Sequence, residues 1–203
     1  MERIDKINYY LEIADTVTKR GTCLRRNYGA IIVKNDEIIS TGYTGAPRGR
    51  KNCIDMGICV RESLKVPRGE RYELCRSVHA EQNAIIHASR ENMIGATMYL
   101  VGKDAKTGAY VENASACSMC KRMIINAGIK QVIIRNAKNK YTVVEVQEWI
   151  DNDESLSGTF GYWLLYYCII SKEKFYIFWK FFQKTIEIFW IVCYNEFGQP
   201  SQF

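Results

Sequence analysis

Apolar positions recur at helical spacing over the first part of the chain, at Ile4, Ile7, Leu11, Ala14 and Val17. This spacing predicts an amphipathic helix that ends near Gly21. Two apolar, β-branched runs follow at residues 30–33 and 38–41, on either side of Asn35-Asp36. Because short polar residues between two such runs favour a tight turn, we expect a β-hairpin here.

Helices alternate with short strands over the middle of the chain. The expected elements are helices over residues 79–91 and 117–127 and strands over residues 97–101 and 131–134. A last segment over residues 143–150 is expected to complete the domain. The second helix is predicted to end at Gly128, because glycine takes the left-handed conformation that closes a helix. This order predicts an α/β fold, a three-layer α/β/α sandwich around a mixed central sheet.

Two segments depart from this pattern. Residues 44–77 carry glycine, proline and scattered charge with little periodicity, which predicts a long functional loop held in place by a ligand or metal. Residues 160–194 are crowded with aromatic and aliphatic side chains, although charges interrupt every stretch long enough for an ordinary membrane span. We therefore expect a catalytic domain over residues 1–158 and a hydrophobic extension over residues 159–203.

Three interpretations of the extension stay open. A helix buried in an oligomer interface and additional sequence unrelated to the domain are both preferred to an interfacial membrane helix.

Composition narrows the class of protein. The formal net charge of +6 suits an anionic substrate such as a nucleotide, although a solvated basic surface is the commoner cause of such a value. No block of like charges marks a nucleic-acid-binding arm. The first six residues are too charged for a signal peptide, and eight cysteines without such a signal indicate a reducing compartment, the cytoplasm.

The chemistry of the chain is concentrated in His79-Ala80-Glu81 and Cys117-Ser118-Met119-Cys120. One imidazole and two thiolates are zinc ligands that leave the fourth tetrahedral position open for water. Cys117 and Cys120, three residues apart in the first turn of a helix, project from the same side. Glu81 would take the proton of the water and return it to the substrate, as the displacement of an amino group from an amidine-like ring carbon requires.

The combined motif is more specific than either half. A lone Cys-x-x-Cys is shared with redox motifs and structural zinc sites, but His-x-Glu followed by Pro-Cys-x-x-Cys is the signature of zinc nucleobase deaminases. Ala116 stands where the signature has proline. Proline would preset the turn that enters the helix, but it binds no metal, so we expect the site to persist.

Five segments of the chain resemble the deoxycytidylate (dCMP) deaminase family, at residues 29–32, 40–49, 79–85, 95–99 and 117–129. The similarity covers roughly residues 1–145 and implies a cytidine-deaminase-like α/β/α sandwich that hydrolyses dCMP to dUMP and ammonia for thymidylate synthesis. It also implies a homo-oligomer, and some members are regulated by dCTP and dTTP.

The resemblance assigns the catalytic zinc ligands to His79, Cys117 and Cys120 and the proton shuttle to Glu81. It also assigns substrate contacts to Thr44, Asn83 and Arg90, with Arg90 matching an arginine that contacts the 5′-phosphate. The other interpretation of Arg90 is a solvent-facing cation at a helix end. Thr44 replaces an asparagine of the family and offers one hydroxyl in place of a separate donor and acceptor.

A second, structural zinc is a further implication of the resemblance. Cys23 and Cys53 match positions that hold such a zinc in some phage-type members, and Cys59 and Cys75 would supply the other two ligands. Four thiols in one region of a cytosolic protein favour metal over disulfides. None of them forms a Cys-x-x-Cys pair, so reduced cysteines without a metal are the alternative.

Two other functions stay open. The first is a deaminase of another cytosine nucleotide, a free base, a pterin-like ring or tRNA adenosine on the same fold. A polynucleotide substrate would call for a basic groove with interleaved aromatic residues, which the catalytic region lacks, so no nucleic-acid partner is expected. The second is a competence-associated, non-catalytic relative, against which the intact His79, Glu81 and cysteine pair argue.

Overall fold

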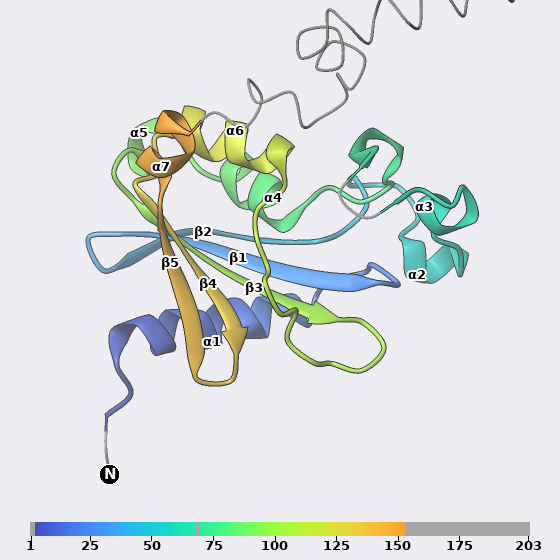
Figure 1. Ribbon diagram of the computed structural model, residues 1–203, viewed down its shortest axis with the longest axis horizontal. Helices are drawn as coiled ribbons and strands as arrows, with labels where there is room; N and C mark the ends of the chain where they lie inside the picture. Colours follow the sequence, from blue (N-terminus) through green and yellow to red (C-terminus); the bar gives the residue numbers. More distant parts are fainter. Residues whose placement is uncertain (1–2, 68–69, 153–203) are drawn as a thin grey trace, which may run out of the picture. The chain divides into compact units, whose positions relative to one another are not determined.

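The computed structural model describes residues 3–67 and 70–152 of the chain (Figure 1). The hydrophobic extension expected over residues 159–203, and the last residues of the expected 1–158 domain, lie outside the described residues. None of the helices in the described part has the length and apolar character needed to cross a membrane.

A mixed sheet forms the middle of the fold, as the sequence predicts. Its strands lie in the order β2-β1-β3-β4-β5, and β3 pairs with β4 in parallel while the other neighbours are antiparallel. The strands are β1 (Arg26–Lys34), β2 (Glu37–Tyr43), β3 (Thr97–Asp104), β4 (Gln131–Ala137) and β5 (Lys140–Glu145). The parallel pair β3 and β4 is joined by the crossover helix α6 (Ser118–Ala127).

Helices cover both faces of the sheet (Figure 1). Helix α1 (Lys6–Thr18) lies on one face, and α4 (Ala80–Ile86), α5 (Arg90–Met93), α6 and α7 (Val146–Asp151) lie on the other. Alternate residues of β3 enter two separate cores, since Leu100 packs on the α4 and α6 side and Val101 on the α1 side. Burial on both faces explains why the central strands are apolar throughout, and the α/β/α sandwich is confirmed.

Two predicted elements differ in the structure. The helix expected over residues 79–91 ends at Ile86, because Ser89 starts α5 as its N-cap and accepts a hydrogen bond from the Asn92 backbone N–H. Residues 143–150 divide between β5 and α7. The predicted hairpin is confirmed, and its turn residues Asn35 and Asp36 both have positive φ, of 51° and 67°.

The 44–77 segment, expected as a loop, contains the short helices α2 (Cys53–Met56) and α3 (Val60–Ser63) and a 3-10 turn at Tyr72–Leu74. Hydrogen bonds attach it to the residues before β1: Thr22 donates its N–H to the Thr44 carbonyl, and Ile54 donates to the Thr22 carbonyl. At its end, Val78 pairs with Gly45 in an isolated β-bridge. Both ends of the segment are therefore held beside the start of α4.

Gly42 allows α4 to approach the sheet closely. A Cβ at this position would lie 2.2 Å from the Ala80 carbonyl oxygen and 2.3 Å from the Ala84 backbone nitrogen. Neighbouring side chains fix the same contact, since Ser40 Oγ donates to the Ala84 carbonyl at 2.8 Å and Asn83 Nδ2 donates to the Tyr43 carbonyl at 2.8 Å. The position of α4, and of the residues at its start, therefore depends on β2.

Candidate metal centre

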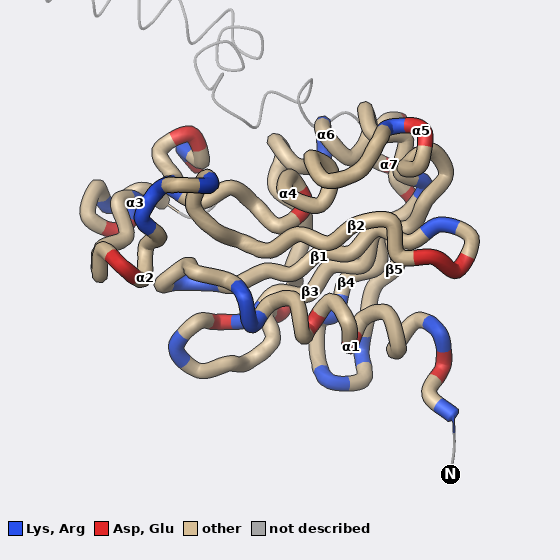
Figure 2. The backbone as a smooth tube through the Cα atoms, turned by 180° about the vertical axis from the view of Figure 1, so that it is seen from behind, with Lys and Arg blue, Asp and Glu red and all other residues tan. Residues whose placement is uncertain are grey.

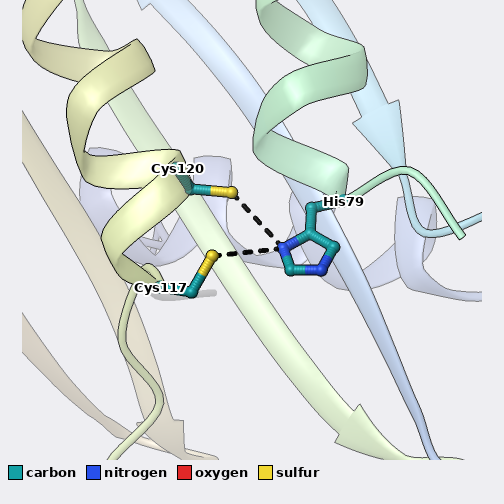
Figure 3. Close-up of side chains that lie close together, drawn as sticks. All are labelled: His79, Cys117 and Cys120. Atoms are coloured by element: carbon teal, nitrogen blue, oxygen red, sulfur yellow. Dashed lines mark hydrogen bonds between the residues drawn. The ribbon is translucent and has the colours of Figure 1, made fainter. Parts of the chain in front are cut away.

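Two helix N-termini bring one imidazole and two thiols together (Figure 3). His79 directly precedes α4, Cys117 directly precedes α6, and Cys120 lies in the first turn of α6. The Nδ1 atom of His79 lies 3.5 Å from Cys117 Sγ and 3.4 Å from Cys120 Sγ. All three potential ligand atoms lie within 4.8 Å of one another.

These spacings fit a tetrahedral zinc ion. Zinc–nitrogen and zinc–sulfur bonds of about 2.1 and 2.3 Å at a tetrahedral angle separate the nitrogen from the sulfur by about 3.6 Å. The two observed separations lie within about 0.2 Å of that value. One nitrogen and two sulfur donors also form a ligand set that zinc favours and that leaves a fourth position for substrate or water. The residues present therefore fit the metal.

The three groups change one another's protonation in the metal-free protein. A hydrogen bond from Cys120 lowers the pKa of Cys117 to about 4, against the effect of burial and with help from His79. Burial opposes protonation of His79, but hydrogen bonds to Cys117 and Cys75 raise its pKa to about 10. The hydrogen bond to Cys117 and burial raise the pKa of Cys120. A metal ion bound by all three residues must therefore displace the protons of His79 and Cys120.

Glu81 lies beside this centre in the first turn of α4. Its side chain is buried, with 4% of the residue exposed, and it lines the same pocket as His79 and Cys117. Burial raises the pKa of its carboxyl group, although the charge of His79 opposes the rise. A buried carboxyl group with a raised pKa is suited to accept and return a proton near neutral pH.

The pocket extends from this centre to the start of β1 and the 44–77 segment. Besides the centre itself, Tyr28, Thr44, Arg61 and Tyr72 contribute to its wall. Tyr72 connects the segment to the metal centre, since its ring meets the His79 ring edge-on with centroids 5.1 Å apart. No motif in the sequence marks Arg61 or Tyr72, which reach the pocket through the irregular path of the segment.

The structure separates the three substrate contacts expected from the sequence. Thr44 lines the pocket, and its hydroxyl oxygen accepts the Tyr28 backbone N–H at 3.1 Å. Asn83 donates to the Tyr43 carbonyl and is not among the residues of the pocket wall. Arg90 begins α5, where its Nε donates to the Asn126 carbonyl at 3.0 Å, and it does not line the pocket either.

The four cysteines expected to hold a second zinc lie in the same part of the fold. Cys23, Cys59 and Cys75 line the pocket. Burial raises the pKa of Cys53, a hydrogen bond with Ser77 opposes the rise, and the thiols of the other three add to it. Within residues 3–67 and 70–152, however, only His79, Cys117 and Cys120 reach the mutual spacing of a metal-ligand group.

Comparisons with known proteins agree with this chemistry. Residues 4–136 match the family described as the cytidine and deoxycytidylate deaminase zinc-binding region. The deoxycytidylate deaminase of Mycobacterium phage D29 is 35% identical over 138 residues, which cover 66% of this chain and 96% of that protein. The deoxycytidylate deaminase of Schizosaccharomyces pombe is 33% identical over 132 residues, which cover 65% of this chain and only 37% of that protein.

Among solved structures, the dCMP deaminase of cyanophage S-TIM5 in complex with dCMP and dUMP aligns with 68% of this chain and 85% of that chain. The sequence identity is 26% and the TM-score is 0.47.

Proposed function

Since the chain belongs to the cytidine and deoxycytidylate deaminase family, we propose that it hydrolyses dCMP to dUMP and ammonia. The observation that carries this proposal is the three-ligand centre with the buried carboxyl group of Glu81 beside it, since Glu81 lines one pocket together with His79 and Cys117. A hydrolytic deamination needs a site for a nucleophilic water and a group that moves its protons, and these residues provide both.

His79, Cys117 and Cys120 would hold the zinc ion. When bound, Zn²⁺ supplies the Lewis acidity that lowers the pKa of a water molecule from 15.7 to about 7. Glu81 accepts the two protons of the attacking water one after the other, and it delivers one to the ring nitrogen and the other to the departing amino group. Oxygen thus replaces nitrogen on C4 of the cytosine ring, and ammonia leaves. Tyr72 restrains the imidazole of His79 by its edge-on ring contact.

The test is ammonia release from dCMP, deoxycytidine, dCTP and cytosine by protein of measured zinc content. We expect dCMP to have the highest kcat/KM of the four, and removal of the metal by a chelator to abolish turnover until zinc is restored. Zinc-loaded protein that releases ammonia from none of the four substrates contradicts the proposed function. A preference for cytosine or deoxycytidine would keep the deaminase chemistry and overturn the substrate.

We also propose the second zinc, bound by Cys23, Cys53, Cys59 and Cys75. The support is that three of these thiols line one pocket and that the fourth is close enough for their charges to affect its pKa. A zinc ion there would cross-link the two halves of the 44–77 segment to the residues before β1.

The second site predicts two zinc ions per chain, falling to one in Cys59→Ser while the catalytic zinc is retained. Metal analysis of the purified protein measures this directly. Ser63→Ala, in the same short helix region and without a thiol, is the control and should keep both ions. One zinc per chain in the unmodified protein would show that these cysteines are reduced and without metal.

Further proposals concern organisation. We propose that residues 1–158 form the deaminase domain and that the chain assembles as a homo-oligomer in the cytoplasm, with dCTP and dTTP as effectors. The family resemblance supports the effectors. The edge strand β5 supports assembly, since Tyr141 and Val143 on it are 39% and 44% exposed. Light scattering of the purified protein measures the size of the oligomer, and its repetition with dCTP or dTTP shows whether either nucleotide changes that size.

A further inference from the structure

Arg61 is a buried arginine in the wall of the proposed active-site pocket. It comes from α3 in the 44–77 segment, and only 7% of the residue is exposed. Its guanidinium carbon lies 4.5 Å from the centre of the Tyr72 ring, which itself contacts the metal ligand His79. A side chain far from the centre in sequence is thus connected to it through one aromatic ring.

The guanidinium group of Arg61 has no anionic partner among the described residues. Its Nη2 atom donates to two backbone carbonyls, those of Pro67 at 2.9 Å and Glu70 at 2.5 Å. Its Nε atom is buried and has no hydrogen-bond partner within residues 3–67 and 70–152. A buried positive charge is costly unless an anion compensates it, so this environment is suited to a negatively charged ligand.

Most of the charged side chains that line the pocket are arginines. Arg25 and Arg26 also line it, whereas Glu81 is the only acidic residue among the described residues of its wall. Arg25 pairs with the exposed carboxylate of Glu62, 3.2 Å away on α3, so Arg61 is the one of the three that combines burial with an unpaired donor. Figure 2 shows that Lys and Arg (blue) and Asp and Glu (red) alternate along the part of the chain that carries α2 and α3, so the positive balance belongs to the pocket wall and not to the whole segment.

We propose that Arg61 binds the 5′-phosphate of the substrate and thereby selects a nucleoside monophosphate over the nucleoside. This inference rests on the proposed deaminase function. The carbonyls of Pro67 and Glu70 engage the two hydrogens of Nη2 and hold the guanidinium plane in place, which leaves the N–H groups of Nε and Nη1 to donate charge-assisted hydrogen bonds to phosphate oxygens. Arg61 takes the role that the family resemblance assigns to Arg90, whose side chain binds Asn126 outside the pocket.

The test compares kcat/KM for dCMP with kcat/KM for deoxycytidine, which lacks only the phosphate. We expect Arg61→Gln to lower the ratio of the two values by about 30-fold, mainly through KM for dCMP, because charge-assisted hydrogen bonds to the phosphate are lost. Arg61→Lys keeps the charge without the separately placed Nε and Nη1 donors and should lower the ratio by about 10-fold. Arg71→Gln removes an equal charge from an exposed position of the same segment and should leave the ratio unchanged.

Equal losses on both substrates in Arg61→Gln would show a purely structural cation and overturn the inference, as would an unchanged ratio. If Arg61→Gln does not fold, the ratio of kcat/KM for dCMP to kcat/KM for deoxycytidine in Arg61→Lys decides the question. Failure of the proposed function has a different signature, because the unmodified zinc-loaded protein would then deaminate neither substrate.

Discussion

Replacing Glu81 by glutamine lowers kcat for dCMP by about 10³- to 10⁴-fold, the upper range for loss of a general acid–base group. Glutamine has nearly the same shape as glutamate but cannot accept the proton of the attacking water. Glu81 is buried, and the described residues of the pocket wall include no second carboxylate that could replace it. Because it lies outside the ligand group of His79, Cys117 and Cys120, the variant should still bind the catalytic zinc.

Ammonia release and zinc content measured on the same sample check this result. The control is Glu91→Gln, an exposed carboxylate one element further along the chain, which should keep full activity. Activity of Glu81→Gln within tenfold of the unmodified protein would assign the proton transfer to another group. Loss of zinc together with activity would instead place Glu81 among the residues that organise the metal centre.

The metal centre is the part of the molecule that local sequence predicts best. His79 and Cys117 each stand immediately before a helix, and Cys120 lies one turn after Cys117. Cys120 points from the first turn of α6 as helical geometry predicts, whereas His79 and Cys117 are N-cap residues with extended backbone, so only their closeness to the helix starts follows from the sequence. What brings the two helices together is the sandwich fold, which the alternation of strands and helices also predicts.

The pocket wall is predicted less well, because the 44–77 segment has no periodic pattern. Arg61 and Tyr72 reach the centre through tertiary contacts, including the hydrogen bond from Ile54 to Thr22 and the bridge between Gly45 and Val78. Arg90, expected from the sequence near the substrate, is not among the described residues of the pocket wall. A continuous helix would have carried it along the direction of α4, but the cap at Ser89 starts a new helix.

Replacing Gly42 by alanine is expected to destabilise the protein and to damage the site through α4. The added Cβ would meet backbone atoms of Ala80 and Ala84 at 2.2 and 2.3 Å, so the helix must shift, since backbone cannot rotate away as a side chain can. Overpacking of this kind costs about 3 kcal/mol of unfolding free energy. A shift of about 1 Å in His79 and Glu81 is enough to lower kcat about 100-fold.

Gly29→Ala is the matched control, because its Cβ would meet the Ala14 carbonyl oxygen at 2.3 Å on the opposite face of the sheet. That clash displaces α1, which carries no residue of the metal centre. Both variants should lower the melting temperature by similar amounts, measured by calorimetry, but only Gly42→Ala should lower kcat and zinc affinity at a temperature where both are folded. Equal losses of activity in the two variants would attribute the effect to global stability, and the close contact between β2 and α4 would then have no separate role in placing Glu81.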